Sequence, residues 1–439
     1  MAPLVMGPIA FVLMLVLCVT GMPIYVACGS VGVAGLVLLL GFDATLGIIS
    51  SLPFAIYASY GLAIIALFYV MGELANASGV TEDAYRAAYI LIGGVRGGLA
   101  MATTIGCAIS AACLGSSVAN AALFTRMAYP EMVKFKYDKS FSLGCIASAG
   151  TFAIMIPPSI SLVTYGVITE ESIGKLLMAG ILPGILTASI YLVSIWVRCR
   201  LNPRLAPVPE IRFSLIEKIK ASKMLWGVAA LFTLVMGGLY AGFFTPTAGG
   251  AVGAFGALLL GLGRKKLTSK SALYRVMMNT ATGVTTIGVL FIGGFFLARF
   301  LTLSGFVEVL VRFITVDLKV PPLAVIGLLS VMYLILGALM DEFTMTLCTM
   351  PFVYPLVKGL GFDGIWFGIV FNKLCQIGLI FPPIAMNLYV VAQAAGKETN
   401  VMDVIKGIWP FIALEIISLV ILILVPDIAL YLPNRMFSK

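Results

Sequence analysis

Two polar stretches interrupt long apolar segments of this chain, and their side chains are suited to binding a hard cation. The first stretch holds Ser116, Ser117 and Asn120, and the second holds Asp341 and Thr344. Hard cations such as Na⁺ take hydroxyl, amide and carboxylate oxygens as ligands. A carboxylate inside an apolar segment is costly unless it is paired or bound to an ion, so Asp341 is the stronger signal. The serines have an alternative role, because small residues let helices pack closely in a membrane.

Each polar stretch is followed by two prolines that must end a helix. The pairs are Pro157-Pro158 and Pro382-Pro383. Proline lacks an amide N–H and clashes with the preceding helical turn. Hydrocarbon tolerates the freed carbonyl groups only where they line a cavity or are buried in protein. The breaks therefore offer carbonyl oxygens to a cation, as discontinuous helices of transporters do.

An internal repeat relates the two stretches. Adding 225 to residue numbers of the first half gives matching positions in the second half: Ser116 and Asp341, Pro130 and Pro355, Asp138 and Asp363, and the two proline pairs. Two unrelated kinked helices would not share this series of Pro and Asp positions. The chain is therefore expected to contain two copies of one unit.

The composition predicts an all-α polytopic membrane protein. Hydrophobic residues make up 61% of the chain and charged residues 11%, and the mean hydropathy is +1.09. A spanning helix needs about 20 apolar residues, and the chain has many such stretches. There is no His, which excludes a histidine metal site or base, and the eight Cys are scattered in apolar segments as packing residues. The net charge of +9 lies in short loops, which indicates membrane topology and no nucleic-acid partner.

The pattern of spans and breaks divides the chain into two repeats and a linker. Residues 1–200 form the first repeat, with a re-entrant hairpin at about 88–128 and a broken helix at about 138–169. Residues 201–223 form a linker with an amphipathic arm, and residues 224–439 form the second repeat. Its hairpin is expected at about 321–357 and its broken helix at about 364–395. The remaining expected elements are spans at 4–20, 22–41, 48–77, 175–197, 224–242, 246–262, 277–302 and 404–425, and an amphipathic stretch at 305–319.

The distribution of Lys and Arg predicts the orientation. If the linker is cytoplasmic, the loops on its side hold 20 of the 28 basic residues, a strong positive-inside bias. Both termini then lie outside, and the two hairpins enter the membrane from opposite sides. Inverted repeats with broken helices are the architecture of secondary transporters, which bind their cargo where the repeats meet.

Lys373 is a charged residue on the half-helix that leads into the second proline pair. A buried ammonium needs a negative partner. We expect this partner to be Asp341, Glu342 or an anionic substrate. A structural ion pair with Asp341 is the alternative to substrate binding.

Several motifs resemble the large membrane subunit of the TRAP (tripartite ATP-independent periplasmic) transporters. They are Gly115-Ser116-Ser117-Val118-Ala119, Tyr129-Pro130-Glu131-Met132, Ile156-Pro157-Pro158-Ser159-Ile160, the run from Tyr165 to Lys175, Ala179-Gly180-Ile181-Leu182-Pro183-Gly184, Met340-Asp341 and Ile377-Gly378-Leu379-Ile380-Phe381-Pro382-Pro383. The likeness covers nearly the whole chain. Asn387 fits the family pattern, whereas Gln376, Lys373 and Glu342 depart from it.

The resemblance implies a Na⁺-coupled elevator transporter in the bacterial inner membrane, with both termini periplasmic. It implies a small four-helix membrane subunit, a periplasmic solute-binding protein and an acidic substrate: a dicarboxylate, a sialic or other sugar acid, or a sulfonate. Apart from these partners only membrane lipids are expected to surround the chain. The implied residues are Ser116, Ser117, Gly150 and Pro157 for one Na⁺ site, Asp341, Thr344, Gly378 and Pro382 for the other, and Asn120, Ser159, Lys373 and Asn387 for the substrate.

Other functions remain as alternatives. A stand-alone Na⁺-coupled anion carrier would share the architecture and lack the soluble partner. A polytopic membrane enzyme would have only Asp341, Glu342 and Lys373 for its chemistry, so we expect the protein not to be an enzyme. A channel fits less well, because hairpins and broken helices suit an occluded site better than a continuous pore. The chain has no phosphate-binding glycine loop, which argues against ATP as the energy source.

Overall fold

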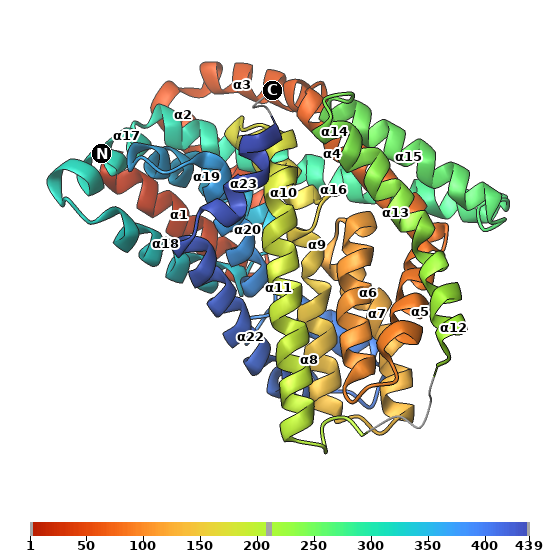
Figure 1. Ribbon diagram of the computed structural model, residues 1–439. Coiled ribbons are helices and arrows are strands. Elements are labelled where there is room, and N and C mark those ends of the chain that lie inside the picture. The colour runs from red at the N-terminus through yellow and green to blue at the C-terminus, as the bar shows by residue number, and fades with distance from the viewer. Residues whose placement is uncertain (1–2, 208–212, 437–439) are drawn as a thin grey trace.

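The computed structural model describes residues 3–207 and 213–436, and all of the regular secondary structure in these ranges is helical (Figure 1). Residues 208–212, the middle of the predicted linker with Arg212, lie outside the described residues. In lipid a chain must satisfy its backbone hydrogen bonds within itself, and helices do this segment by segment. Six helices in the described ranges are long and apolar enough to cross a membrane, or seven if a pair bent by 42° counts as one span. The protein is an all-helical, polytopic membrane protein.

Four helices precede the first hairpin. They are α1 (Pro3–Val19), α2 (Ile24–Leu40), α3 (Phe42–Tyr57) and α4 (Tyr60–Ala77). The prediction of one span at 48–77 is wrong, because the chain changes helix at Ser59. The Ser59 hydroxyl accepts a hydrogen bond from the Leu62 amide and thereby caps a new helix.

The next helices form a hairpin, a broken helix and a long span. An amphipathic helix, α5 (Val80–Ile92), leads into the hairpin of α6 (Gly98–Leu114) and α7 (Ser117–Lys134). The broken helix is α8 (Lys139–Gly150), α9 (Phe152–Met155) and α10 (Ile160–Thr169), and the span is α11 (Ile173–Leu201). The break between α9 and α10 contains the first proline pair, and it is here that the chain bends by 42°.

The linker arm is continuous with the span that follows it. After α12 (Leu215–Ser222) the helix continues through a tight turn and a π-helical turn as α13 (Trp226–Phe232) and α14 (Gly238–Tyr240). The amphipathic arm expected within residues 201–223 is thus the first part of a longer helix. The helix starts at a capping box formed by Ser214 and Glu217. Two long helices come next, α15 (Pro246–Gly263) and α16 (Lys270–Leu303).

The same order of elements then returns. A short helix, α17 (Phe306–Arg312), extended by a π-helical turn at Phe313–Asp317, precedes the second hairpin of α18 (Pro322–Gly337) and α19 (Glu342–Gly359). The second broken helix is α20 (Gly364–Gly378) and α21 (Met386–Ala394), followed by α22 (Val401–Leu424) and a final helix α23 (Asp427–Met436).

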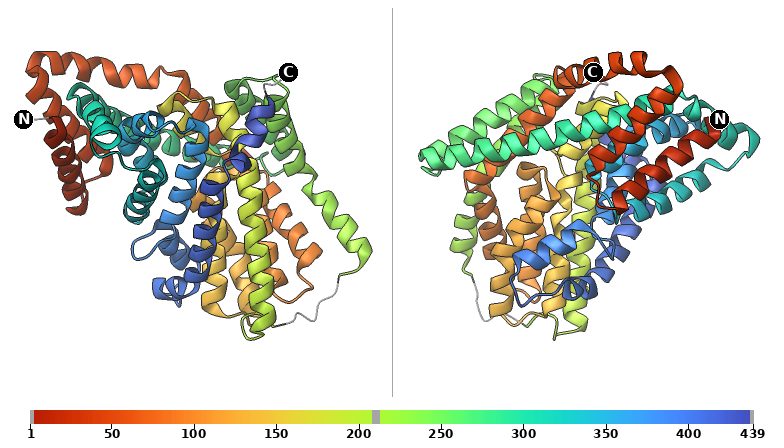
Figure 2. Two further views of the ribbon diagram at one scale, coloured as in Figure 1. Left: turned by 60° about the vertical axis from the view of Figure 1, so that its left-hand side comes forward. Right: turned by 180° about the vertical axis from the view of Figure 1, so that it is seen from behind.

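The two repeats interlock. Helix α22 of the second repeat packs along α8 of the first. The backbones approach so closely that a Cβ on Gly144 would overlap the carbonyl group of Gly407, and a Cβ on Gly407 would overlap the carbonyl group of Ser140. Small residues permit this kind of approach between membrane helices. Figure 1 shows α6 to α11 and α22 as an upright block, with α3, α15 and α16 across one end of it. The view from behind shows the long helix α16 passing from one side of the molecule to the other (Figure 2, right).

Candidate functional site

The tip of the first hairpin is a glycine followed by a serine cap. Gly115 has a φ of +62°, which favours glycine, and it ends α6. The Ser116 hydroxyl then accepts a hydrogen bond from the Ala119 amide at 3.5 Å and starts α7. A Cβ on Gly115 would lie 3.0 Å from a side-chain carbon of Ile160 and 3.5 Å from the carbonyl oxygen of Pro158. The hairpin tip therefore lies against the first proline break.

The tip of the second hairpin is capped by a carboxylate. One oxygen of Asp341 accepts hydrogen bonds from the amides of Phe343 and Thr344, each at 2.9 Å, and the other accepts one from the Thr344 hydroxyl at 2.9 Å. This places Asp341 and Thr344 together, at the N-terminus of α19, where the helix dipole favours negative charge. The neighbouring Glu342 is 4% exposed.

Both tips open onto one cavity. Its volume is 470 Å³, and its lining includes Ser116 from the first tip and Asp341 from the second. Ile160 and Met386, at the starts of the half-helices after the two breaks, also line it. Hairpins that are far apart in the sequence thus meet at a single space, as expected for a binding site between repeats.

The cavity is acidic. Its lining contains three carboxylates, Glu73, Asp341 and Glu342, and none of the described residues that line it is Lys or Arg. Glu73 on α4 accepts a hydrogen bond from the Asn279 amide of α16 at 3.0 Å. The sequence did not predict that Glu73 and α16 line the cavity. The position of Glu73, an acidic residue near the end of an apolar segment, was the signal that could have identified it.

A second polar group lies between the first hairpin and the broken helices. The amide nitrogen of Asn120 donates to the carbonyl oxygens of Cys107, at 3.2 Å, and Gly150, at 3.3 Å. The amide nitrogen of Asn387 donates to the Ser117 hydroxyl at 2.8 Å and to a carbonyl of α8 at 3.4 Å. The side-chain oxygens of both Asn120 and Asn387 are buried and have no hydrogen-bond partner among the described residues. Buried acceptors of this kind normally have a partner, so these two oxygens are available to a ligand.

The first proline break contains Pro157 and Ser159, which were expected at the Na⁺ site and the substrate site of the first half. The Ser159 hydroxyl donates to the Ile154 carbonyl at 2.5 Å and accepts from the Leu162 amide at 3.4 Å, which makes it the cap of α10. Pro157 is buried and lies against Gly180 of α11. Ser159 therefore has two backbone partners that stabilise the break.

At the second break, Gly378 lies directly against the end of α18. A Cβ on Gly378 would come within 2.6 Å of the Gly337 Cα, which brings this end of α20 beside the second hairpin tip. Pro382 follows it in the loop before α21 and is half-buried.

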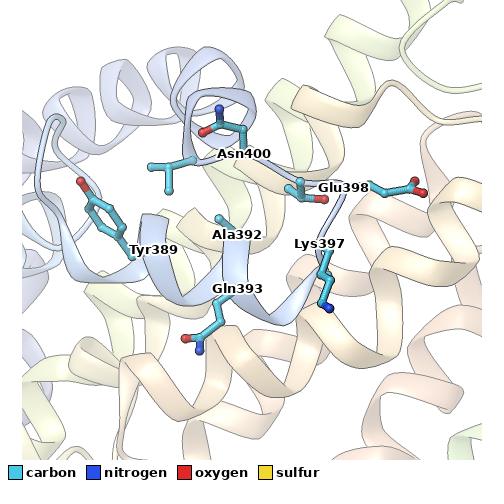
Figure 3. A pocket seen from close by; sticks show the side chains of 9 residues that line it. Tyr389, Ala392, Gln393, Lys397, Glu398 and Asn400 are labelled. Atoms are coloured by element: carbon cyan, nitrogen blue, oxygen red, sulfur yellow. The ribbon is translucent and has the colours of Figure 1, made fainter.

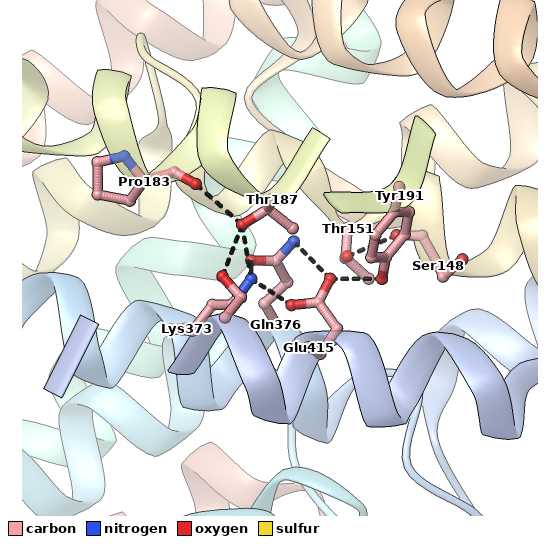
Figure 4. Close-up of polar contacts among 9 residues, drawn as sticks. Ser148, Thr151, Pro183, Thr187, Tyr191, Lys373, Gln376 and Glu415 are labelled. Carbon is pink, nitrogen blue, oxygen red and sulfur yellow. Dashed lines mark hydrogen bonds and ion pairs between the residues drawn. The ribbon is translucent and has the colours of Figure 1, made fainter. Parts of the chain in front are cut away.

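Lys373 has a different partner from those expected. Its ammonium forms an ion pair with Glu415 of α22, and both side chains are completely buried. The ammonium also donates to the Thr187 hydroxyl of α11 at 2.8 Å and to the side-chain oxygen of Gln376 at 3.3 Å (Figure 4). The expectation of Asp341 or Glu342 as its protein partner is wrong, because Glu415 of α22 supplies the carboxylate.

Glu415 is held by hydrogen bonds as well as by the ion pair. One of its oxygens accepts from the Tyr191 hydroxyl at 2.5 Å and from the Gln376 amide at 3.3 Å. Figure 4 shows the resulting cluster between α11, α20 and α22. A single acidic residue inside the apolar segment 404–425 was the signal that could have identified Glu415.

Another hollow, of 650 Å³, lies where α21 joins α22. It is lined by residues such as Tyr389, Gln393 and Lys397 (Figure 3). The Lys139 ammonium fastens the loop by donating to the Glu398 carbonyl at 2.8 Å and by an ion pair with α22. None of the site residues expected from the sequence lines this hollow, so the cavity at the hairpin tips is the candidate site.

Comparison with known proteins assigns the family. The family model described as Tripartite ATP-independent periplasmic transporter, DctM component, matches residues 11–428. The C4-dicarboxylate TRAP transporter large permease protein DctM of Pseudomonas aeruginosa is 33% identical over 378 residues, 85% of this chain and 86% of that protein. The 2,3-diketo-L-gulonate TRAP transporter large permease protein YiaN of Escherichia coli is 32% identical over 376 residues, 84% of this chain and 86% of that protein. The structure of the Alcanivorax borkumensis YdaH transporter shares the fold, with a TM-score of 0.62 at 14% identity over 89% of this chain and 90% of that one. The chain belongs to the tripartite ATP-independent periplasmic transporters, as their large permease subunit.

Proposed function

We propose that this permease imports an acidic organic solute together with Na⁺. Both relatives described above are named for carboxylate solutes, a C4-dicarboxylate and 2,3-diketo-L-gulonate. In the proposed system a periplasmic solute-binding protein delivers the solute, and a small membrane subunit completes the membrane part. The protein is a transporter permease and not an enzyme.

The observation that carries the proposal is the convergence of both hairpin tips on one acidic cavity. Three carboxylates and no described Lys or Arg line this space. An anionic solute cannot enter such a cavity favourably unless cations enter with it, because like charges repel strongly in a medium of low dielectric constant. Na⁺ bound at the hairpin tips supplies these cations and makes solute binding depend on Na⁺.

We assign the two Na⁺ ions to the two halves of the site. One Na⁺ is held near the first tip by Ser116, Ser117, the Gly150 carbonyl and the Pro157 break. Asn120 and Asn387, whose free oxygens lie beside this group, serve as ligands or as contacts to the solute.

The other Na⁺ is held near the second tip by Asp341, Thr344, Gly378 and the Pro382 break. The support is the pairing of Asp341 with Thr344 at the start of α19 and the packing of Gly378 against α18. Lys373 is omitted from the solute site, because Glu415 already neutralises it.

The transport cycle that fits this arrangement is an elevator. The hairpins and broken helices move as one body within the outer helices, and the two repeats have inverted orientations in the bacterial inner membrane. The positive-inside distribution of Lys and Arg supports an orientation with both termini in the periplasm. Two Na⁺ entering with a monoanion carry one net positive charge inward, worth about 2.3 kcal/mol per 100 mV.

The test is uptake by vesicles that contain the permease with its small membrane subunit. Carboxylic, sugar and sulfonic acids are presented with the binding protein under an inward Na⁺ gradient, and choline replaces Na⁺ in the control. We expect uptake of an acid that requires Na⁺ and increases with an inside-negative potential. Equal uptake in choline would refute Na⁺ coupling, and full uptake without the binding protein would favour the stand-alone carrier.

A further inference from the structure

A basic hollow lies where the start of α5, the end of α12 and the loop after α15 meet. Its volume is 620 Å³. Five basic residues line it: Arg86, Lys220, Lys223, Arg264 and Lys266. Two acidic residues, Glu82 and Asp83, also line it, which leaves an excess of three positive charges. The hollow is separate from the cavity at the hairpin tips and has no part in the proposed transport mechanism.

Two of the five basic residues already have carboxylate partners. Arg264 pairs with Asp83 at 2.5 Å, and Lys266 pairs with Glu82 at 3.8 Å. The other three, on α5 and at the end of α12, are exposed and form no ion pair with any residue in the ranges 3–207 and 213–436. The unpaired charge is therefore concentrated in one hollow, where it favours an anion.

An apolar groove adjoins the basic hollow. The groove has a volume of 370 Å³ and lies between α6, α11 and α13, with only apolar residues among those that line it in the described chain. Met224 lines the hollow and Val228 lines the groove. Leu225 and Val228 of the groove alternate along the helix with Met224 and Trp226 of the hollow, so the two spaces lie on adjoining faces of the same helix.

The helix beside the hollow also exposes apolar side chains. On α12, Leu215 is 79% exposed, Ile216 67% and Ile219 61%, and the charged residues of the hollow follow directly after them. Trp226, at 55% exposed, lies under the Arg264 guanidinium at 5.7 Å. A helix with basic and apolar surfaces, and a Trp at its junction with a span, is typical of the membrane interface.

We propose that the hollow and the groove together bind one anionic phospholipid. The phosphate group contacts Arg86, Lys220 and Lys223, and an acyl chain lies in the groove between α13 and the first hairpin. Clusters of Lys and Arg at the ends of spans attract anionic headgroups. A free anion would use the hollow alone, whereas a lipid uses both features. Residues of α6, α11 and α13 line the groove, so the lipid lies against both an outer helix and the hairpin block.

The experiment is native mass spectrometry of the full chain in detergent, with phosphatidylglycerol or phosphatidylcholine of the same acyl chains added. We expect the unmodified chain to retain one phosphatidylglycerol in preference to phosphatidylcholine. Combining Arg86→Gln, Lys220→Gln and Lys223→Gln should lower this retention at least tenfold. The matched control combines Lys134→Gln, Arg204→Gln and Lys406→Gln, which removes three exposed charges elsewhere and should leave retention unchanged.

A second variant tests the groove. Ala229 lines the groove and is exposed, so Ala229→Trp should fill the groove without overpacking the protein core. Retention of phosphatidylglycerol should then fall, and the unfolding temperature should stay the same. Equal retention in the two triple variants would overturn the proposal. Displacement of the lipid by inorganic phosphate would also overturn the proposal and would indicate a free-anion site. Loss of the lipid when the small membrane subunit is added would overturn the proposal as well and would indicate a subunit interface.

Discussion

The ammonium of Lys373 and the carboxylate of Glu415 form an ion pair in which neither side chain has any exposed surface. Lys373 lies on α20 and Glu415 on α22, and Tyr191 of α11 donates a hydrogen bond to the same carboxylate. Three helices from both repeats are therefore joined at one buried polar cluster. Removal of two charges from water is costly, and each charge is tolerable only because the other is present.

Breaking this pair should destabilise the protein more than removing it. Lys373→Met leaves the Glu415 carboxylate without its cation, and we expect the free energy of unfolding to fall by about 3–5 kcal/mol. Glu415→Leu should have a similar effect through the unpaired ammonium. The double variant has no buried charge and should recover most of the loss, because an apolar replacement of a buried pair is often neutral.

Thermal unfolding of the four proteins in one detergent measures this difference. Uptake by the double variant provides a further check, since a purely structural pair can be replaced without loss of Na⁺-dependent transport. If the double variant is stable but inactive, Lys373 takes part in transport, as the sequence analysis expected. If its loss of stability equals the sum of the single losses, the two residues do not act as a pair.

The hairpin tips could be located from the sequence because their signals are local. A helix break inside an apolar run needs a glycine, a cap or a proline near the break, and Gly115, Ser116 and Asp341 are all visible without knowledge of the fold. In the structure Gly115 is the C-cap of α6, and Ser116 and Asp341 are the N-caps of α7 and α19.

The partner of Lys373 could not be located in the same way. Glu415 stands alone in an apolar segment, and its pairing depends on how α22 is rotated against α20 and α11. That rotation is set by tertiary packing, including the close backbone approach at Gly144 and Gly407, and no periodicity within either helix specifies it. For the same reason the contribution of Glu73 on α4 to the cavity became evident only in the assembled structure.

Close packing at Gly378 should be essential for the second half of the site. A Cβ there would lie 2.6 Å from the Gly337 Cα, which is backbone and cannot rotate away. We expect Gly378→Ala to separate α20 from the second hairpin, to cost about 1–3 kcal/mol and to weaken Na⁺-dependent uptake. Gly327→Ala on α18 is the matched control, because it meets nothing within 4 Å and should be neutral or slightly stabilising. Similar effects of the two substitutions would contradict the packing argument.

Asp341→Asn should separate the structural role of this residue from its charge. One oxygen of Asp341 caps α19 through two amides, and an Asn oxygen can accept the same bonds, so stability without Na⁺ should change by no more than about 1 kcal/mol. Na⁺ at one hundred times its dissociation constant for the site at the second hairpin tip should stabilise the unmodified protein by about 2.7 kcal/mol through that site. We expect the variant to lose most of this gain.

The measurement is the unfolding temperature as NaCl replaces choline chloride at constant ionic strength. Asp363→Asn provides the control, because Asp363 caps α20 in the same way, with one oxygen accepting from the amides of Ile365 and Trp366. It removes an equivalent charge outside the cavity and should retain the full Na⁺ response. A normal Na⁺ response in Asp341→Asn would exclude Asp341 as a Na⁺ ligand.

The contact between Ser117 and Asn387 should couple the first hairpin to the second broken helix. The Asn387 amide donates to the Ser117 hydroxyl at 2.8 Å, both residues are buried, and they come from different repeats. Ser117→Ala and Asn387→Ala should each cost about 1–3 kcal/mol, since each leaves a buried polar group without its partner. The double variant should cost less than the sum of the two single variants, by about 0.5–1.5 kcal/mol, because the hydrogen bond can be lost only once.

Tyr333→Phe is the control, because it removes a separate hydrogen bond between the hydroxyls of Tyr333 and Thr349 within the second hairpin. Its effect should be additive with that of Ser117→Ala when unfolding is measured without Na⁺. Additivity of Ser117→Ala with Asn387→Ala would show that the hairpin and α21 are not coupled through this bond, and the first Na⁺ site would then have to form without Asn387.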